Sequence, residues 1–217
     1  KKSFRSSISD LISKGVKPTY YFISGAGSRS KFNKKNLNII SKTLKQEQKK
    51  YNLKLSGGDT TVSNKVSFSM TSIGFSNKIV ERNKAKLNDD IYVTGNIGDS
   101  YMGLKILKSN ISINPKVKKY FINQFYSPNL PFKIYKKLDL FANTSMDISD
   151  GLIADMMKLI NKQKLSFEIN INKIPISVNL KNYLKKSKKK AYLYLFNGDD
   201  YQILFTSHKK NRSLIKA

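Results

Sequence analysis

The sequence lacks cysteine and tryptophan, and it contains a single histidine among its 217 residues. The absence of cysteine excludes disulfide bonds and thiolate metal sites, and it fits a reducing cytoplasm. With His208 alone, we expect neither a zinc site nor a Ser-His-Asp triad. No apolar run approaches the roughly 20 residues that span a bilayer, and there is no signal-peptide pattern. We therefore expect a cytoplasmic protein with no membrane partner.

Acidic residues are also scarce, because 14 Asp and Glu face 41 Lys and Arg, which gives a formal net charge of +27. Such a charge is typical of nucleic-acid binding proteins. However, almost all of the positive charge is lysine spread along the chain, whereas base and phosphate recognition usually draws on arginine. A codon bias of an AT-rich genome explains this composition, so we expect no specific nucleic-acid partner. A nucleic-acid binder stays as an alternative that charge alone suggests.

About half of these few acids lie in short motifs of Gly, Ser and Thr. The motifs are ISDL with Asp10, SGGDTT with Asp59, GNIGDS with Asp99, MDISDG with Asp147 and Asp150, and FNGDDY with Asp199 and Asp200. Hard divalent cations take oxygen ligands, and glycine lets the backbone approach a ligand closely. Acids in such places indicate a site for divalent metal and phosphate.

Each motif also has a purely structural interpretation. SGGDTT follows a short expected strand, where the glycine N–H groups and Asp59 suit phosphate or metal, but Gly-Gly-Asp is equally an ordinary β-turn. GNIGDS lies between a strand and a helix, so Asp99 or Ser100 would cap that helix and its N-terminus would favour an anion. An ordinary strand–helix turn explains GNIGDS at least as well.

The remaining two motifs each contain a pair of acids. If a helix begins near Ser149 as its N-cap, Asp147 and Asp150 crowd its first turn and repel each other, and a bound cation relieves that repulsion. In FNGDDY, neighbouring side chains of an extended chain point to opposite faces. One of Asp199 and Asp200 would therefore enter a site while the other makes a structural hydrogen bond.

Periodicity predicts alternating helices and strands, which indicates an α/β or α+β fold. We expect helices at 3–13, 33–51, 115–125, 131–140 and 149–161, and another that ends at residue 109. We expect strands at 19–24, 53–55, 66–75, 90–94, 144–148, 167–171 and 201–206, with the strand at 90–94 buried. The charged segment 76–88 lacks strong periodicity and marks a domain boundary.

The ordered set ISDL, SGGDTT, YVTGNIGDSYMGL, SMDISDGLIAD and NGDDYQILFT resembles the thiamine-monophosphate kinase family. That family belongs to the superfamily of aminoimidazole ribonucleotide synthetase. The resemblance covers nearly the whole chain, and it implies ATP-dependent phosphorylation of thiamine monophosphate to thiamine diphosphate. Another superfamily enzyme with a different acceptor, or a catalytically inactive nucleotide-binding homologue, stays as an alternative.

The resemblance also implies the roles of individual residues. It places Asp10, Asp59, Asp147 and Asp150 at Mg²⁺, it places Gly58, Asp59, Arg82 and Ser149 at ATP, and it places Asp199 at the substrate. No general base is assigned. Phosphoryl transfer to a phosphate that is already ionised needs metal ions and positioning more than it needs a base.

The fold implied by the resemblance consists of two α/β subdomains of the aminoimidazole ribonucleotide synthetase-like kind. Residues 1–77 would form part of an N-terminal subdomain that binds metal and ATP, and residues 78–217 would form part of a C-terminal subdomain. The ATP site would lie between them. Strands of the first subdomain would pair in a dimer barrel, so we expect a homodimer. The family's N-terminal acidic segment and C-terminal aromatic have no counterpart, so we expect an excerpt of a longer protein.

Overall fold

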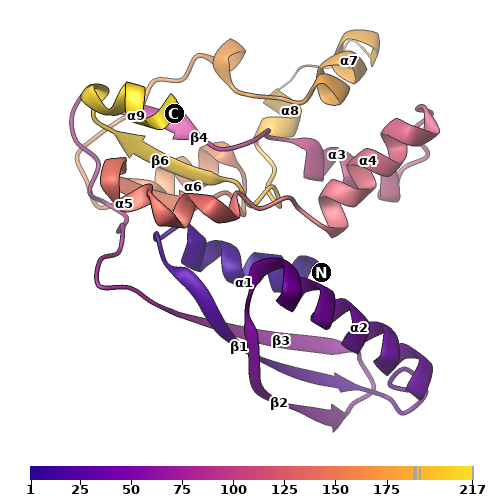
Figure 1. Ribbon diagram of the computed structural model, residues 1–217. Helices are drawn as coiled ribbons and strands as arrows, with labels where there is room; N and C mark the ends of the chain where they lie inside the picture. The colour runs from indigo at the N-terminus through magenta and orange to yellow at the C-terminus, as the bar shows by residue number, and fades with distance from the viewer. Residues whose placement is uncertain (188–189, 191, 217) are drawn as a thin grey trace.

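The computed structural model, which describes residues 1–187, 190 and 192–216, contains two three-stranded sheets (Figure 1). The first sheet has the order β2-β1-β3, and β1 runs parallel to β2 and antiparallel to β3. Its strands are β1 (Lys17–Gly27), β2 (Lys54–Val62) and β3 (Ser67–Phe75). Helices α1 (Lys2–Ile12) and α2 (Lys34–Tyr51) lie on one face of this sheet.

The second sheet is antiparallel and has the order β4-β6-β5. Its strands are β4 (Asp90–Val93), β5 (Thr144–Asp147) and β6 (Ile203–Ser207). The α-helices of this half are α3 (Asp99–Lys108), α4 (Pro115–Tyr126), α5 (Leu138–Phe141), α6 (Leu152–Leu159), α7 (Val178–Ser187), α8 (Tyr192–Leu195) and α9 (Arg212–Lys216). Short 3₁₀ helices are η1 (Phe132–Lys136), η2 (Ile171–Lys173) and η3 (Lys209–Asn211).

Helix α1 joins the two halves through a common hydrophobic core. Its apolar residues recur every four positions, so Phe4, Ile8 and Ile12 share one face of the helix, and all three are buried. This face packs in one cluster with Tyr21 of β1 and with Phe205 of β6. Full burial of such side chains stabilises a fold by about 1.5–3 kcal/mol each. The position of α1 relative to both sheets is therefore fixed.

A buried ion pair reinforces this junction. Arg5 on α1 donates from Nε and Nη2 to both carboxylate oxygens of Glu47 on α2, at 2.7 and 2.9 Å. Its Nη1 donates to the carbonyl oxygens of Ser127 and Pro128, which follow α4. Each of these oxygens accepts a hydrogen bond from the Arg5 guanidinium. The Glu47 carboxylate therefore balances the positive charge of Arg5 inside the protein.

Most of the expected elements are confirmed, but four expectations are wrong. The strand expected at 53–55 continues as β2 through the whole of SGGDTT, because pairing with β1 keeps that segment extended. The strand at 90–94 is an edge strand, and its Ile91 is 37% exposed. The helix expected at 131–140 divides into η1 and α5 at Lys137. Segment 167–171 is not a strand, since it pairs with none, and its Phe167 and Ile169 pack through their side chains against a core cluster of the second half.

The segment 76–89 connects the two halves and contains neither helix nor strand. The division expected between residues 77 and 78 falls in this connection and stays a prediction. Among the described residues, no helix combines the length and the apolar character needed to cross a membrane.

Candidate functional site

Two carboxylates from different halves of the molecule meet between α1 and the end of β5. Asp147 ends β5 with only 6% of its surface exposed, and its Oδ2 accepts a hydrogen bond of 2.7 Å from Oγ of Ser9 on α1. Burial, together with the negative charge of Asp10, raises the pKa of Asp147 to about 6. The pKa of Asp10 is also raised, chiefly because the neighbouring chain removes water from its carboxylate. Two like charges held this close repel each other, and a cation between them would relieve that repulsion.

Positive side chains lie on the same side of the molecule. Lys14, one turn after Asp10, donates from Nζ to the carbonyl oxygen of Ser145 at 3.2 Å. Burial lowers the pKa of Lys14, and the positive charge of Arg82 lowers it further. The positive charge of Arg82 also lowers the pKa of Asp10, against the larger effect of burial, which raises it. Arg82 thus lies close enough to Asp10 and Lys14 to act on both, as a residue of one phosphate and metal site would.

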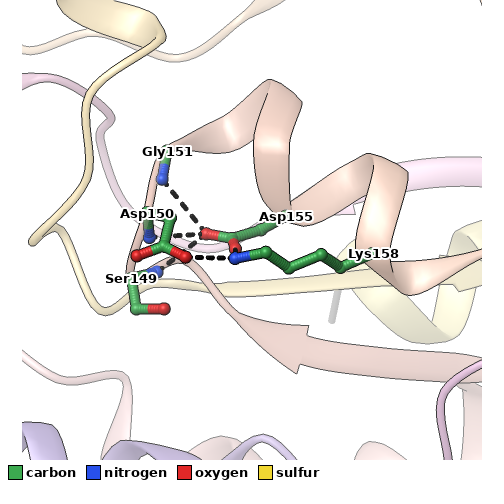
Figure 2. A network of polar contacts seen from close by, with 5 residues as sticks. All are labelled: Ser149, Asp150, Gly151, Asp155 and Lys158. Carbon is green, nitrogen blue, oxygen red and sulfur yellow. Dashed lines mark hydrogen bonds and ion pairs between the residues drawn. The ribbon is translucent and has the colours of Figure 1, made fainter. Parts of the chain in front are cut away.

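The loop after β5 is held from inside by Asp155 of α6 (Figure 2). The Asp155 Oδ2 accepts hydrogen bonds from the backbone N–H groups of Ser149, Asp150 and Gly151 at 2.9, 2.9 and 3.1 Å. Its Oδ1 accepts from Lys158 Nζ at 3.0 Å, and Lys158 also contacts the Asp150 carboxylate. The Ser149 hydroxyl points away from this network.

This arrangement corrects two expectations about MDISDG. Ser149 is not the N-cap of α6, because the helix begins at Leu152 with Gly151 as its N-cap, and the Ser149 N–H itself donates to Asp155. Asp147 and Asp150 do not crowd one helical turn either. Asp147 faces α1, whereas Asp150 is exposed and pairs with Lys158.

The loop before β6 adjoins the Ser149 loop. The backbone N–H of Asp199 donates to the Ser149 carbonyl oxygen at 2.9 Å. The Asp199 carboxylate accepts from the Tyr201 hydroxyl at 3.0 Å and pairs with Lys2 Nζ at 2.9 Å. Asp199 also has a φ of 72°, in the left-handed region that is uncommon for residues other than glycine. The expected substrate residue and the expected ATP residue thus lie on touching loops.

Asp200 points inward and caps α3 from outside that helix. It accepts hydrogen bonds from the N–H groups of Gly98 at 2.8 Å and Ser100 at 3.3 Å. Burial raises its pKa to about 7, although these two bonds act in the opposite direction. The capping role expected for Asp99 or Ser100 is therefore wrong, since Asp99 instead accepts from the Tyr120 and Ser177 hydroxyls. Asp99 and Asp200 also line a cavity of about 400 Å³.

Asp59 and Gly58 lie apart from these groups on β2. Asp59 is exposed, its Oδ1 accepts from the Thr60 N–H at 2.7 Å, and its register partner on β1 is Ser24. Glycine is required at 58, because a Cβ there would lie 1.8 Å from the Ile23 carbonyl oxygen. Within residues 1–187, 190 and 192–216, no three His, Cys, Asp or Glu side chains are grouped so that they could hold a metal ion. The structure joins Asp10 with Asp147 and leaves Asp59 and Asp150 separate.

Comparison with known proteins identifies the family, although no family model matches the chain. The chain is 35% identical over 219 residues to thiamine-monophosphate kinase of Buchnera aphidicola subsp. Acyrthosiphon pisum, covering 99% of this chain and 66% of that relative. The crystal structure of thiamine monophosphate kinase from Aquifex aeolicus superposes with a TM-score of 0.89 at 30% identity, covering 95% of this chain and 70% of the other. The chain belongs to the thiamine-monophosphate kinase family. The predicted fold is thereby confirmed.

A second solved structure of the family, AaThiL complexed with AMPPCP and TMP, has the same TM-score of 0.89 at 29% identity and covers 96% of this chain and 69% of that one. The chain spans 53% of the curated A. aeolicus relative and 66% of the B. aphidicola relative. The match to the family therefore covers only this share of the relatives' length.

The sequence analysis assigns no role to Asp155. It lies four residues after Gly151, where an acid in the first turn of a helix is favoured, so capping rules point to it. The structural hydrogen bond expected for one of Asp199 and Asp200 is made by Asp200. Its partner Gly98 is 102 residues away in sequence, so local patterns do not reveal that contact.

Proposed function

We propose that the full-length protein transfers the γ-phosphoryl group of ATP to the phosphate of thiamine monophosphate, giving thiamine diphosphate and ADP. Membership of the family supports this, and so does a related structure that contains AMPPCP and TMP. The observation that carries the proposal is the meeting of Asp10 with Asp147 beside Lys14 and Arg82. Phosphoryl transfer needs such a combination of acidic metal ligands and positive charge.

Magnesium is the cation that fits these residues best. Asp10 and Asp147 offer only hard oxygen ligands, and their mutual repulsion favours a cation between them. Asp59 and Asp150 would complete the set of metal ligands once nucleotide is bound. When bound, Mg²⁺ neutralises phosphate oxygens and so makes the γ-phosphorus accessible to a negatively charged acceptor.

The chain's own residues would bind and orient the two phosphate substrates. Arg82 and Lys14 would balance phosphate charge, while Ser149 and Gly58 would contact ATP. The bond between the γ-phosphorus and its bridging oxygen breaks as an acceptor phosphate oxygen bonds to that phosphorus, and ADP leaves. The acceptor is already ionised at neutral pH, so no general base is required.

Asp199 would contact thiamine monophosphate. Its left-handed backbone and its hydrogen bond to Ser149 hold it beside the proposed ATP residue. Its carboxylate is 32% exposed, so it is accessible to a substrate that displaces Lys2. Together with Ser149 it would align donor and acceptor.

We propose that the protein is a homodimer formed through the uncovered face of the first sheet. Tyr20 and Phe22 alternate with buried Tyr21, so they lie on the face opposite α1 and are 37% and 40% exposed. Phe75, whose ring packs edge-on against Tyr20, is 71% exposed. A second copy packed on these rings would remove a large apolar surface from water. We further propose a cytoplasmic location and no specific nucleic-acid partner.

The direct test is turnover by the full-length protein. Incubation with ATP, Mg²⁺ and thiamine monophosphate, followed by chromatography, should yield thiamine diphosphate and ADP in equal amounts. Thiamine and selenide serve as alternative acceptors. ATP consumption only with another acceptor, or nucleotide binding without any turnover, would contradict the proposal.

A further inference from the structure

The backbone of residues 149–151 forms a cluster of N–H donors that converge on one point. Three successive N–H groups at the start of a helix make a concave site that usually binds an anion such as phosphate. Here the anion is a side chain of the same molecule, because Asp155 Oδ2 receives all three hydrogen bonds. A phosphate group therefore finds these donors already occupied.

Asp155 is itself enclosed and fully compensated. It has no exposed surface, and Lys158 Nζ donates to its second oxygen at 3.0 Å. The carboxylate thus has partners for both oxygens and holds the loop from the protein side. The Ser149 hydroxyl points away from the backbone donors, whereas the exposed Asp150 carboxylate pairs with Lys158 (Figure 2).

The opposite side of the loop is fixed by close backbone packing. A Cβ on Gly198 would lie 1.8 Å from the Ser149 carbonyl oxygen, and a Cβ on Gly151 would lie 2.6 Å from the Phe196 carbonyl oxygen. The Asp199 N–H donates to that same Ser149 oxygen. Movement of the loop would therefore also move Asp199.

We infer that Asp155 is a positioning residue for the kinase site, an inference that rests on the proposed function. It acts through the 149–151 loop, and it sets where Ser149 and Asp150 meet nucleotide and metal. Phosphate recognition consequently falls to side chains and metal rather than to the N-terminus of α6. Residues that orient metal ligands typically change metal affinity or activity by about 10–100-fold when they are replaced.

The test compares Asp155→Asn with a matched control in the full-length protein. Asparagine keeps the size and one acceptor oxygen but removes the charge. Asp89→Asn is the control, because Asp89 also accepts a backbone bond, from Lys86, and side-chain bonds, from Asn143 and Thr206, away from the loop. The measurements are Mn²⁺ affinity in the presence of AMPPCP, amide hydrogen exchange of residues 149–151, and kcat and KM for both substrates.

We expect Asp155→Asn to weaken Mn²⁺ binding by about tenfold or more and to lower kcat by about 10–100-fold. Exchange of the 149–151 amides should accelerate, while the far-ultraviolet circular dichroism stays that of the wild type. Asp89→Asn should leave affinity and kcat within about threefold. Wild-type Mn²⁺ affinity in Asp155→Asn, or equal losses in both variants, would overturn the inference. The affinity comparison needs no turnover, so an inactive wild type would overturn the proposed function alone.

Discussion

The acidic motifs SGGDTT and MDISDG are similar in sequence but have opposite surroundings in the fold. Asp59 of the first lies exposed on edge strand β2, and its recorded hydrogen bond is to the neighbouring Thr60 N–H. Asp147 of the second is buried against α1, and the loop after it is fixed by Asp155. The second motif is therefore organised before any ligand binds, whereas the first depends on a ligand or a second copy for its environment.

Substitution of the acid in each motif should lower activity in both cases but change the stability of the protein in only one. Asp147→Asn and Asp59→Asn should each lower kcat by about a hundredfold or more, because both remove a proposed metal ligand. At pH 8, however, Asp147→Asn should raise the free energy of unfolding by roughly 2–3 kcal/mol, since the raised pKa of Asp147 makes its ionised form costly in the fold. Asp59→Asn should change it by less than about 0.5 kcal/mol. Urea denaturation without ligand measures the free energy of unfolding of both variants. Equal values would contradict the difference in burial between Asp147 and Asp59.

Glycine substitutions test whether the exposed motif is nevertheless fixed by its backbone. Gly58→Ala should cost roughly 2–4 kcal/mol, because the added methyl group would meet the Ile23 carbonyl oxygen on the paired strand. Gly25→Ala on β1 is the matched control, since its methyl group would meet only the side chains of Phe32 and Phe68, which can shift. The control should cost about 1 kcal/mol or less. Thermal unfolding checks the pair, and a harmless Gly58→Ala would mean that β2 is not held against β1.

The pH dependence of stability tests the acidic motif FNGDDY through its buried Asp200. The folded pKa of Asp200 is about 7, above the value of about 3.9 in unfolded chains, so the folded state binds more protons between these values. The free energy of unfolding should therefore fall as the pH rises from about 4 to 7 and then level off. Asp200→Asn should make this dependence visibly flatter. Identical slopes in wild type and variant, measured by urea denaturation at several pH values, would contradict the assignment.

The smallest change in metal binding is expected at Lys158, which pairs with Asp150 on the loop surface. Lys158→Met should strengthen Mn²⁺ binding a few-fold, because an ammonium group no longer competes for the Asp150 carboxylate. It should also cost about 1–3 kcal/mol of stability, because the fully buried Asp155 carboxylate loses the ammonium group that pairs with its second oxygen. Calorimetric titration with Mn²⁺ and AMPPCP measures the change. Weaker binding would show instead that Lys158 supports the site.

Local sequence patterns were sufficient for the elements that have strong periodicity. The spacing of Phe4, Ile8 and Ile12 predicts α1, and the alternation of small and apolar residues predicts β3. The same rules failed at SGGDTT, where glycines suggested a turn but pairing with β1 keeps the chain extended. They also failed at segment 167–171, whose alternation fits a strand, although the segment pairs with no strand and packs through Phe167 and Ile169 instead.

The site was predictable as a set of residues but not as an arrangement. The resemblance to the family brings Asp10 and Asp147 into one hypothesis, and the fold places them together across 137 positions of sequence. The capping roles expected for Asp99 and Ser149 are wrong, because Asp200 accepts from the N–H groups at the start of α3 and Asp155 accepts from those of the loop before α6. Tertiary packing decides which acid accepts hydrogen bonds from these backbone N–H groups. The sequence of a single motif does not determine that packing.

We propose that Asp10 and Asp147 together form the primary cation site. Electron paramagnetic resonance of Mn²⁺, titrated into the full-length protein with AMPPCP, tests it most directly. We expect Asp147→Asn to weaken Mn²⁺ binding by about tenfold or more without loss of folded structure. Mn²⁺ binding as tight in Asp147→Asn as in the wild type would contradict it.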